Sequence, residues 1–165
     1  MAAGSTYSTI ATNTVSGTST NSVSFTSIPS TYTDLVLIVN SQKTTSGVVN
    51  IYLQFNGDSG TNYSATRVYG TGSIASSFRQ TSTIWGIAGN QTDSPSSTIF
   101  HIMNYKNTTT YKNFLSRYDC AGESTSAGVA LWQNTNAINR VDCLLSASNF
   151  FSAGSTLTLY GIAAA

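Results

Sequence analysis

Charged side chains are scarce in this sequence. Asp, Glu, Lys and Arg together make up 8% of its 165 residues, against roughly a quarter in an average protein. Seven basic and six acidic residues leave a formal net charge of +1. No cluster of Lys or Arg forms the positive patch that nucleic-acid binding requires. We therefore expect no nucleic acid among the partners of this protein.

The residues that most often bind metals or attack substrates are also few. The chain holds one histidine, His101, and two cysteines, Cys120 and Cys143. One histidine excludes multi-histidine metal sites, and two cysteines are too few for a disulfide scaffold. Residues 1–6 lack the basic start and apolar middle of a signal peptide, which predicts synthesis in the cytoplasm. There both cysteines should stay thiols, with a bridge formed late as the alternative.

Long apolar runs and helix-forming residues are missing as well. No apolar stretch approaches the ~20 residues of a membrane-spanning helix, so we expect no membrane contact. Glu occurs once, at Glu123, whereas Ser, Thr and Asn are abundant. Thr favours strands, and Ser, Asn and Gly favour turns. This composition favours an all-β chain.

The clearest strand covers residues 49–55, where apolar and polar side chains alternate one by one. A period of two sends the apolar side chains to one face and the polar ones to the other, which predicts a half-buried strand. Residues 35–39 are apolar throughout and predict a central strand covered on both faces. Further strands are predicted at residues 23–26, 65–68, 83–88, 97–104, 111–118, 127–132, 138–145 and 155–162, and residues 9–12 are a candidate for one more short strand.

Eight to ten short strands separated by turns, with little helix, predict a single-domain antiparallel β-sandwich that is jelly-roll-like. Residues 1–8 are small and polar and predict a flexible N-terminal arm, with the sandwich domain over residues 9–165. Ile74–Gln80 fits a short helix or a loop. Gly89–Pro95 predicts a loop.

His101 lies between Phe100 and Ile102, which favours a hydrogen-bonded histidine of the core or of an interface. A catalytic dyad with Cys120 or Cys143 is the alternative. Neither cysteine has the glycine or cationic neighbours that lower a thiol pKa.

Carboxylates give no better sign of catalysis. A glycosidase needs two acids that face each other across a cleft, whereas most acids here lie in or beside predicted turns, namely Asp34, Asp58, Asp93 and Asp119. The other two are Glu123 and Asp142. We therefore predict that the protein is not an enzyme, with no catalytic residue, no cofactor-binding residue and no metal ligand.

The loop Asn56–Asn62 has oxygen-bearing side chains at alternate positions around glycines. Calcium loops begin in this way, but only one carboxylate, Asp58, is present. The favoured interpretation is a hairpin turn at Asn56-Gly57, because both residue types take positive φ at little cost. Aromatic residues are numerous enough to predict a contact surface, with these as its candidates: Tyr52, Tyr63, Tyr69, Tyr105, Tyr111, Tyr118 and Trp132.

Several strings resemble a family of small virion structural proteins, also described as putative tail fibre proteins, of tailed bacteriophages. The most specific are Asn-Gly-Asp-Ser-Gly-Thr-Asn-Tyr at residues 56–63 and Leu-Tyr-Gly-Ile at 159–162. The resemblance runs in order from about Ile10 to Ile162 and includes residues 28–37, 102–105, 111–112 and 128–132. It supplies no catalytic residue, and the two cysteines are not features of the family.

The resemblance implies a protein made in the host cytoplasm and assembled on the exterior of the virion. We expect a capsid decoration (cement) protein, which stabilises the shell through subunit contacts. The alternative is a tail fibre or appendage subunit that recognises the host surface through the loops Asn56–Tyr63 and Asn104–Thr110. Its expected partners are the major capsid protein or tail proteins, and a homotrimer is the expected assembly.

Overall fold

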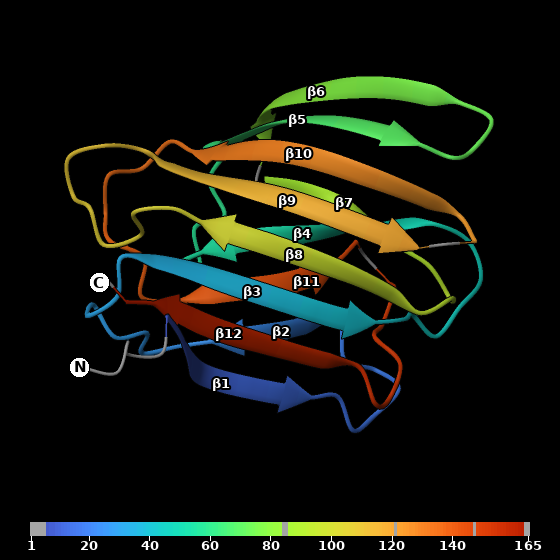
Figure 1. The fold of residues 1–165 in the computed structure, drawn as a ribbon, viewed down its shortest axis with the longest axis horizontal. Helices are drawn as coiled ribbons and strands as arrows, with labels where there is room; N and C mark the ends of the chain where they lie inside the picture. Colours follow the sequence, from blue (N-terminus) through green and yellow to red (C-terminus); the bar gives the residue numbers. More distant parts are fainter. Residues whose placement is uncertain (1–5, 84–85, 121, 147, 164–165) are drawn as a thin grey trace.

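The computed structural model describes residues 6–83, 86–120, 122–146 and 148–163, and it is all-β, with two antiparallel sheets packed face to face (Figure 1). No helix in these ranges is long and apolar enough to cross a membrane. The strands are β1 (Tyr7–Thr14), β2 (Ser22–Phe25), β3 (Asp34–Ser41), β4 (Val49–Phe55), β5 (Tyr63–Gly70), β6 (Ala75–Thr83), β7 (Gly86–Gln91), β8 (Ser96–Ile102), β9 (Lys112–Cys120), β10 (Ser124–Trp132), β11 (Val141–Leu145) and β12 (Thr156–Ile162).

Eight of these strands have the connectivity of a jelly roll. β1, β12, β3 and β8 lie side by side in the larger sheet, and β2, β11, β4 and β7 form the smaller one. In chain order the path changes sheet at every step except between β4 and β7, which gives the double-sheet pattern of two Greek keys. The predicted β-sandwich is confirmed.

The other four strands are two hairpins inserted into this plan. The β5–β6 hairpin stands between β4 and β7 in the chain, and the β9–β10 hairpin stands between β8 and β11. Both join the larger sheet, which therefore runs β1-β12-β3-β8-β9-β10-β5-β6. Figure 1 shows this eight-stranded sheet in front of the four-stranded one. Four of its strands thus lie outside the jelly-roll plan.

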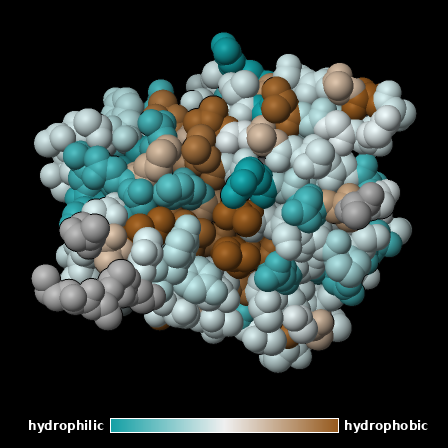
Figure 2. Space-filling model, viewed as in Figure 1, coloured by the Kyte–Doolittle hydropathy of each residue, from teal (hydrophilic) through white to brown (hydrophobic). Residues whose placement is uncertain are grey.

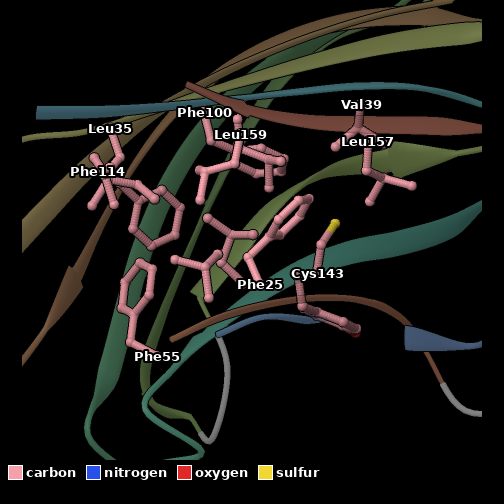
Figure 3. Close-up of a cluster of buried hydrophobic side chains, with 14 of the residues drawn as sticks. Phe25, Leu35, Val39, Phe55, Phe100, Phe114, Cys143, Leu157 and Leu159 are labelled. Atoms are coloured by element: carbon pink, nitrogen blue, oxygen red, sulfur yellow. The ribbon is translucent and has the colours of Figure 1, made fainter. Parts of the chain in front are cut away.

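The core lies between the two sheets and follows the alternation of the strands. Ile51, Leu53 and Phe55 of β4 are fully buried, as the period-two pattern predicts. They meet apolar residues of the larger sheet, such as Phe100 and Leu159 (Figure 3).

An aromatic cluster joins the inserted hairpins to the jelly roll. Phe55 of β4 lies 5.6 Å from the ring of Phe114 on β9 and 5.6 Å from the ring of Trp132 on β10. Tyr63 of β5 stacks on Trp132 at 6.4 Å, and its hydroxyl accepts a hydrogen bond from the Phe55 backbone N–H. Aromatic pairs at such separations add stability beyond their buried area. The hairpins therefore share one core with the eight jelly-roll strands.

Several sequence predictions need correction. The described residues form twelve strands rather than eight to ten. One reason is that Ile74–Gln80 is neither helix nor loop but lies mostly in β6, which pairs with β5. The predicted Gly89–Pro95 loop begins too early, since β7 continues to Gln91. Of the predicted strand at residues 83–88, Thr83 ends β6, residues 84–85 lie outside the described residues, and residues 86–88 belong to β7.

The predicted N-terminal arm is wrong for Tyr7 and Ser8, which belong to β1. Tyr7 and Ser8 pair with Ile162 and Gly161 in the ladder between β1 and β12, and residues 1–5 lie outside the described residues. Small polar side chains are compatible with an edge strand when a neighbouring strand supplies the hydrogen bonds.

The two sheets approach closely at β7. A Cβ atom added to Gly86 would lie 2.5 Å from Cζ of Phe114, and one added to Gly89 would lie 3.0 Å from Cβ of Tyr118. Both contacts are with β9 of the opposite sheet. Glycine at these positions therefore lets the smaller sheet lie directly on the inserted β9–β10 hairpin.

We predict that Gly86→Ala lowers the free energy of unfolding by about 1–3 kcal/mol, because the added methyl group overpacks the contact with Phe114. Urea unfolding of the purified protein measures this change. The control is Gly17→Ala, since a Cβ added there meets nothing within 4 Å. Equal stability of the two variants would contradict the close approach of the sheets.

Candidate functional site

The string at residues 56–63 forms a rigid turn where the chain crosses between the sheets. Asn56 and Gly57 have φ of 54° and 68°, and the Asp58 N–H donates to the Phe55 carbonyl at 2.9 Å. Positive φ at both positions is the turn conformation that the sequence predicts. The hairpin prediction is wrong, however, because β4 and β5 belong to different sheets.

Asp58 is the centre of hydrogen bonding in this loop. Its carboxylate accepts hydrogen bonds from the Gly60 N–H at 2.9 Å, from Asn62 Nδ2 at 2.9 Å and from the indole N–H of Trp132 at 2.7 Å. Partial burial raises the pKa of Asp58, but the hydrogen bonds from Asn62, Trp132, Gly60 and Asn134 together lower it below the ordinary value. The carboxylate thus fastens the loop to β10.

The calcium alternative for this loop stays a prediction with less support. A cation would need oxygen atoms that already accept N–H donors, because both oxygens of Asp58 are engaged in this way. Within the described residues, no group of three or more His, Cys, Asp or Glu side chains could hold a metal ion.

Asn56 connects this turn to the segment between β10 and β11. Its Nδ2 donates to the Ala137 carbonyl at 2.9 Å, and its Oδ1 accepts from the backbone N–H groups of Asn139 and Arg140 at 2.9 and 3.1 Å. The buried Lys112 ties the same segment to the β8–β9 loop, because its Nζ donates to the carbonyls of Thr110 and Thr135. Burial lowers the pKa of Lys112.

The loops Asn56–Tyr63 and Asn104–Thr110 therefore lie at the same end of the sandwich, linked through residues 133–140. Hydrogen bonds within each loop add to these links: the Asn107 side chain, for example, accepts from the N–H groups of Thr109 and Thr110. Tyr111 stands beside them with 53% of its surface exposed. These two loops, which we call the loop end of the sandwich, therefore present hydroxyl and amide groups, and their hydrogen bonds hold them in place.

Few of the predicted contact aromatics reach the surface. Tyr63, Tyr105, Tyr118 and Trp132 are at most 1% exposed. Burial raises the pKa of Tyr63 and of Tyr118 well above the ordinary value. Of the candidates, Tyr111 is the one that is largely exposed. The sequence prediction of an aromatic contact surface is wrong for the buried members, which instead build the core.

His101 lies on the outward face of β8, where its Nε2 is 3.1 Å from Asp34 Oδ2. Its cross-strand neighbour on β9 is the exposed Leu115. Cys120 points to the opposite, inward face of β9, and Cys143 is buried in the core on β11. Both cysteines are free thiols. The His–Cys dyad is therefore wrong. The hydrogen bond predicted for His101 is present, but the residue does not lie in the core, and its place in an interface stays a prediction.

Most of the acidic side chains lie apart from one another, and several of them already accept hydrogen bonds or form an ion pair. Asp34 also accepts from the Asn104 N–H, and the buried Asp142 is paired with Arg140 Nε at 2.9 Å. Asp119 and Glu123 are brought together, since both line a hollow of about 470 Å³ at the β9–β10 turn.

Desolvation raises the pKa of the Cys143 thiol far above its usual range, so this cysteine remains protonated.

Sequence reasoning missed the outward face of the inserted hairpins. Val68, Leu115 and Val129 are 57%, 45% and 43% exposed there. Leu115 and Val129 are direct cross-strand partners on β9 and β10, so they form one continuous apolar patch. Figure 2 shows apolar residues gathered over the middle of this face. The signal in the sequence is an apolar residue at the outward positions of strands whose inward positions are already apolar.

Basic side chains accompany this patch, which we call the outer-face patch (Val68, Leu115, Val129, Arg79 and Arg117). Arg117 lies beside Ile99 and Ala127 in the ladder, and these residues line a groove of about 880 Å³. Arg79 lines a smaller hollow of about 270 Å³ with Val129. The patch combines apolar side chains with two exposed guanidinium groups.

No protein-family model, no curated protein and no solved structure matches this chain. The class of protein is therefore defined by the fold: an all-β, antiparallel sandwich with jelly-roll connectivity and two inserted hairpins.

We predict that Asp58→Asn lowers the free energy of unfolding by about 1–3 kcal/mol at neutral pH, because charge-assisted hydrogen bonds are lost. The folded-state pKa of Asp58 is below that of an unfolded Asp, about 3.9. Its contribution to stability is therefore complete above that value and is lost as pH falls through the folded-state pKa.

Urea unfolding at a series of pH values from about 7 to 2 tests this prediction, and Asp58→Asn should flatten the acid limb. The exposed Asp93 provides the control variant, Asp93→Asn. An acid limb of Asp58→Asn that is as steep as that of the unmodified protein would refute the structural role of this carboxylate.

Proposed function

We propose that this chain is a non-enzymatic structural protein of a bacteriophage virion, located on the particle exterior, where it works as a capsid decoration protein. The observation that carries the proposal is the outer-face patch. Fully burying a Val or Leu side chain contributes about 1.5–3 kcal/mol, so Val68, Leu115 and Val129 gain most when a partner covers them. The partner in this proposal is the major capsid protein, and the assembly is a homotrimer.

The resemblance of residues 10–162 to small virion structural proteins supports this proposal. Jelly rolls occur in viral capsid domains and in lectins, so the fold is compatible with the proposal without selecting it. The loops at one end of the sandwich are hydrogen-bonded through Asn56, Asp58 and Lys112, which limits the entropy lost when a partner binds.

Deleting the gene should yield heads that lose their DNA at lower temperature and in milder osmotic shock than complete particles. The physical reason is that a decoration protein contributes buried area between shell subunits, which opposes internal pressure. Adding the purified protein back should restore resistance. Leu115→Glu and Val129→Glu should fold normally but fail to restore it, because a carboxylate on the outer-face patch is costly to bury.

Val48→Glu is the matched control, since Val48 is 53% exposed in the β3–β4 connection, away from the patch. Heads without the protein that withstand heat, osmotic shock and chelation as well as complete particles would contradict the decoration role. Gel densitometry of virions gives a second measurement: hundreds of copies mean shell, and a few dozen or fewer mean tail.

The second candidate is a tail appendage that recognises the host surface, and the exposed loop end with Tyr111 favours it. An aromatic ring beside amide and hydroxyl groups suits glycan or protein recognition. In that case the purified protein would bind host cells and block infection, and Tyr111→Ala would weaken the block about tenfold or more, as loss of an interface hot spot does. Absence of competition at a saturating dose removes this candidate.

A further inference from the structure

Arg67, on the inward face of β5, is only 7% exposed, which is rare for an arginine. One terminal nitrogen donates to Asn90 Oδ1 at 3.0 Å. The guanidinium carbon lies 5.4 Å from the ring centre of Tyr69 and 4.8 Å from that of Phe78. These contacts hold the group at the rim of the sandwich, between the β5–β6 hairpin and β7. None of them brings a negative charge.

Acidic side chains are absent from the strands that surround this guanidinium. The sequences of β4, β5, β6, β7, β8 and β10 contain no Asp or Glu. The one acid of β9, Asp119, lies on the outward face of the sheet. Burial disfavours the charged form and lowers the pKa of Arg67, against a smaller opposing effect of nearby tyrosines. Arginine nevertheless stays protonated in proteins, so the charge remains.

Two buried polar atoms without a hydrogen-bond partner lie on Arg67 itself and on the neighbouring strand β10. Nε of Arg67 is buried and makes no hydrogen bond, and the same holds for Ser126 Oγ on β10. Ser126 is two residues from Gly128, the cross-strand partner of Arg67, and such diagonal neighbours lie about 7–8 Å apart. Buried donors without partners are uncommon and point to a bound water or ion.

We propose that Arg67 binds a small inorganic anion of the halide class through its guanidinium Nε–H, together with the Ser126 hydroxyl. An anion satisfies both donors at once and neutralises a charge that the fold leaves uncompensated. Arg67 and Ser126 are each only 7% exposed, which favours a small anion such as a halide over a larger one. Arg67 thereby becomes part of a binding site, independent of the virion role proposed above.

The test is thermal unfolding of the purified full chain in sodium chloride against sodium gluconate, at equal ionic strength. Above its dissociation constant, chloride should raise the midpoint in proportion to the logarithm of its concentration, by about 2–4 °C for each tenfold increase. Arg67→Met should abolish the difference. Arg79→Met, which removes an exposed arginine from neighbouring β6, should keep it, because exposed charges respond to ionic strength rather than to the identity of the anion.

Crystals of the unmodified protein grown in sodium bromide provide a measurement that does not depend on a variant folding. An anomalous bromide peak in contact with Arg67 Nε and Ser126 Oγ supports the proposal. Water alone at that position, or equal midpoints in chloride and gluconate, overturns it. A midpoint that ignores chloride but rises with protein concentration, and does so only while Arg67 is present, would assign the site to a carboxylate of a second copy and would also overturn it.

Discussion

The architecture depends on the contacts of one residue, Trp132. Its indole ring lies in the aromatic cluster beside Phe55 and Tyr63, and its N–H donates to Asp58. Trp132 belongs to β10, Phe55 to β4 and Asp58 to the crossing between the sheets. A single side chain therefore joins an inserted hairpin, the smaller sheet and the connection between them. Because the ring is fully packed and its one polar atom is satisfied, this junction combines apolar burial with a charge-assisted hydrogen bond.

The insertion of two hairpins makes the sandwich asymmetric, and the unusual surfaces follow from that asymmetry. Eight strands face four, so the β5–β6 end of the larger sheet extends beyond β7, the edge strand of the smaller one. Glycines in β7 allow close contact over β9, whereas the rim beyond it is filled by Arg67 with Tyr69 and Phe78. An inward-pointing charge next to an edge strand also discourages pairing with another chain. The outward face of the same hairpins carries the exposed apolar side chains.

The sequence predicts strands in which apolar and polar residues clearly alternate. It fails where the structure of a segment depends on contacts with distant parts of the chain. Residues 49–55 alternate clearly, and the structure buries Ile51, Leu53 and Phe55 as expected. Residues 75–83 are rich in Ser and Thr and have no apolar face, because β6 is an edge strand that β5 stabilises through backbone hydrogen bonds. The Asn56-Gly57 turn is readable from residue type alone, but whether it joins strands of one sheet or of two depends on contacts with Trp132 and residues 137–140. Arg67 carries no sequence signal, since its burial depends on neighbours from three strands.

The low charge of the chain limits how the outer-face patch and the loop end can bind a partner. A chain with few ionisable groups cannot rely on long-range electrostatic steering, so its contacts must gain free energy from buried apolar area and from hydrogen bonds to Ser, Thr and Asn. The outer-face patch supplies the apolar area on a rigid sheet, and the loop end supplies amides and hydroxyls on a hydrogen-bonded frame. A partner that covers a broad, pre-organised sheet face loses little entropy on binding. In the decoration role proposed above, a close-packed shell of repeated subunits would be a partner of this kind.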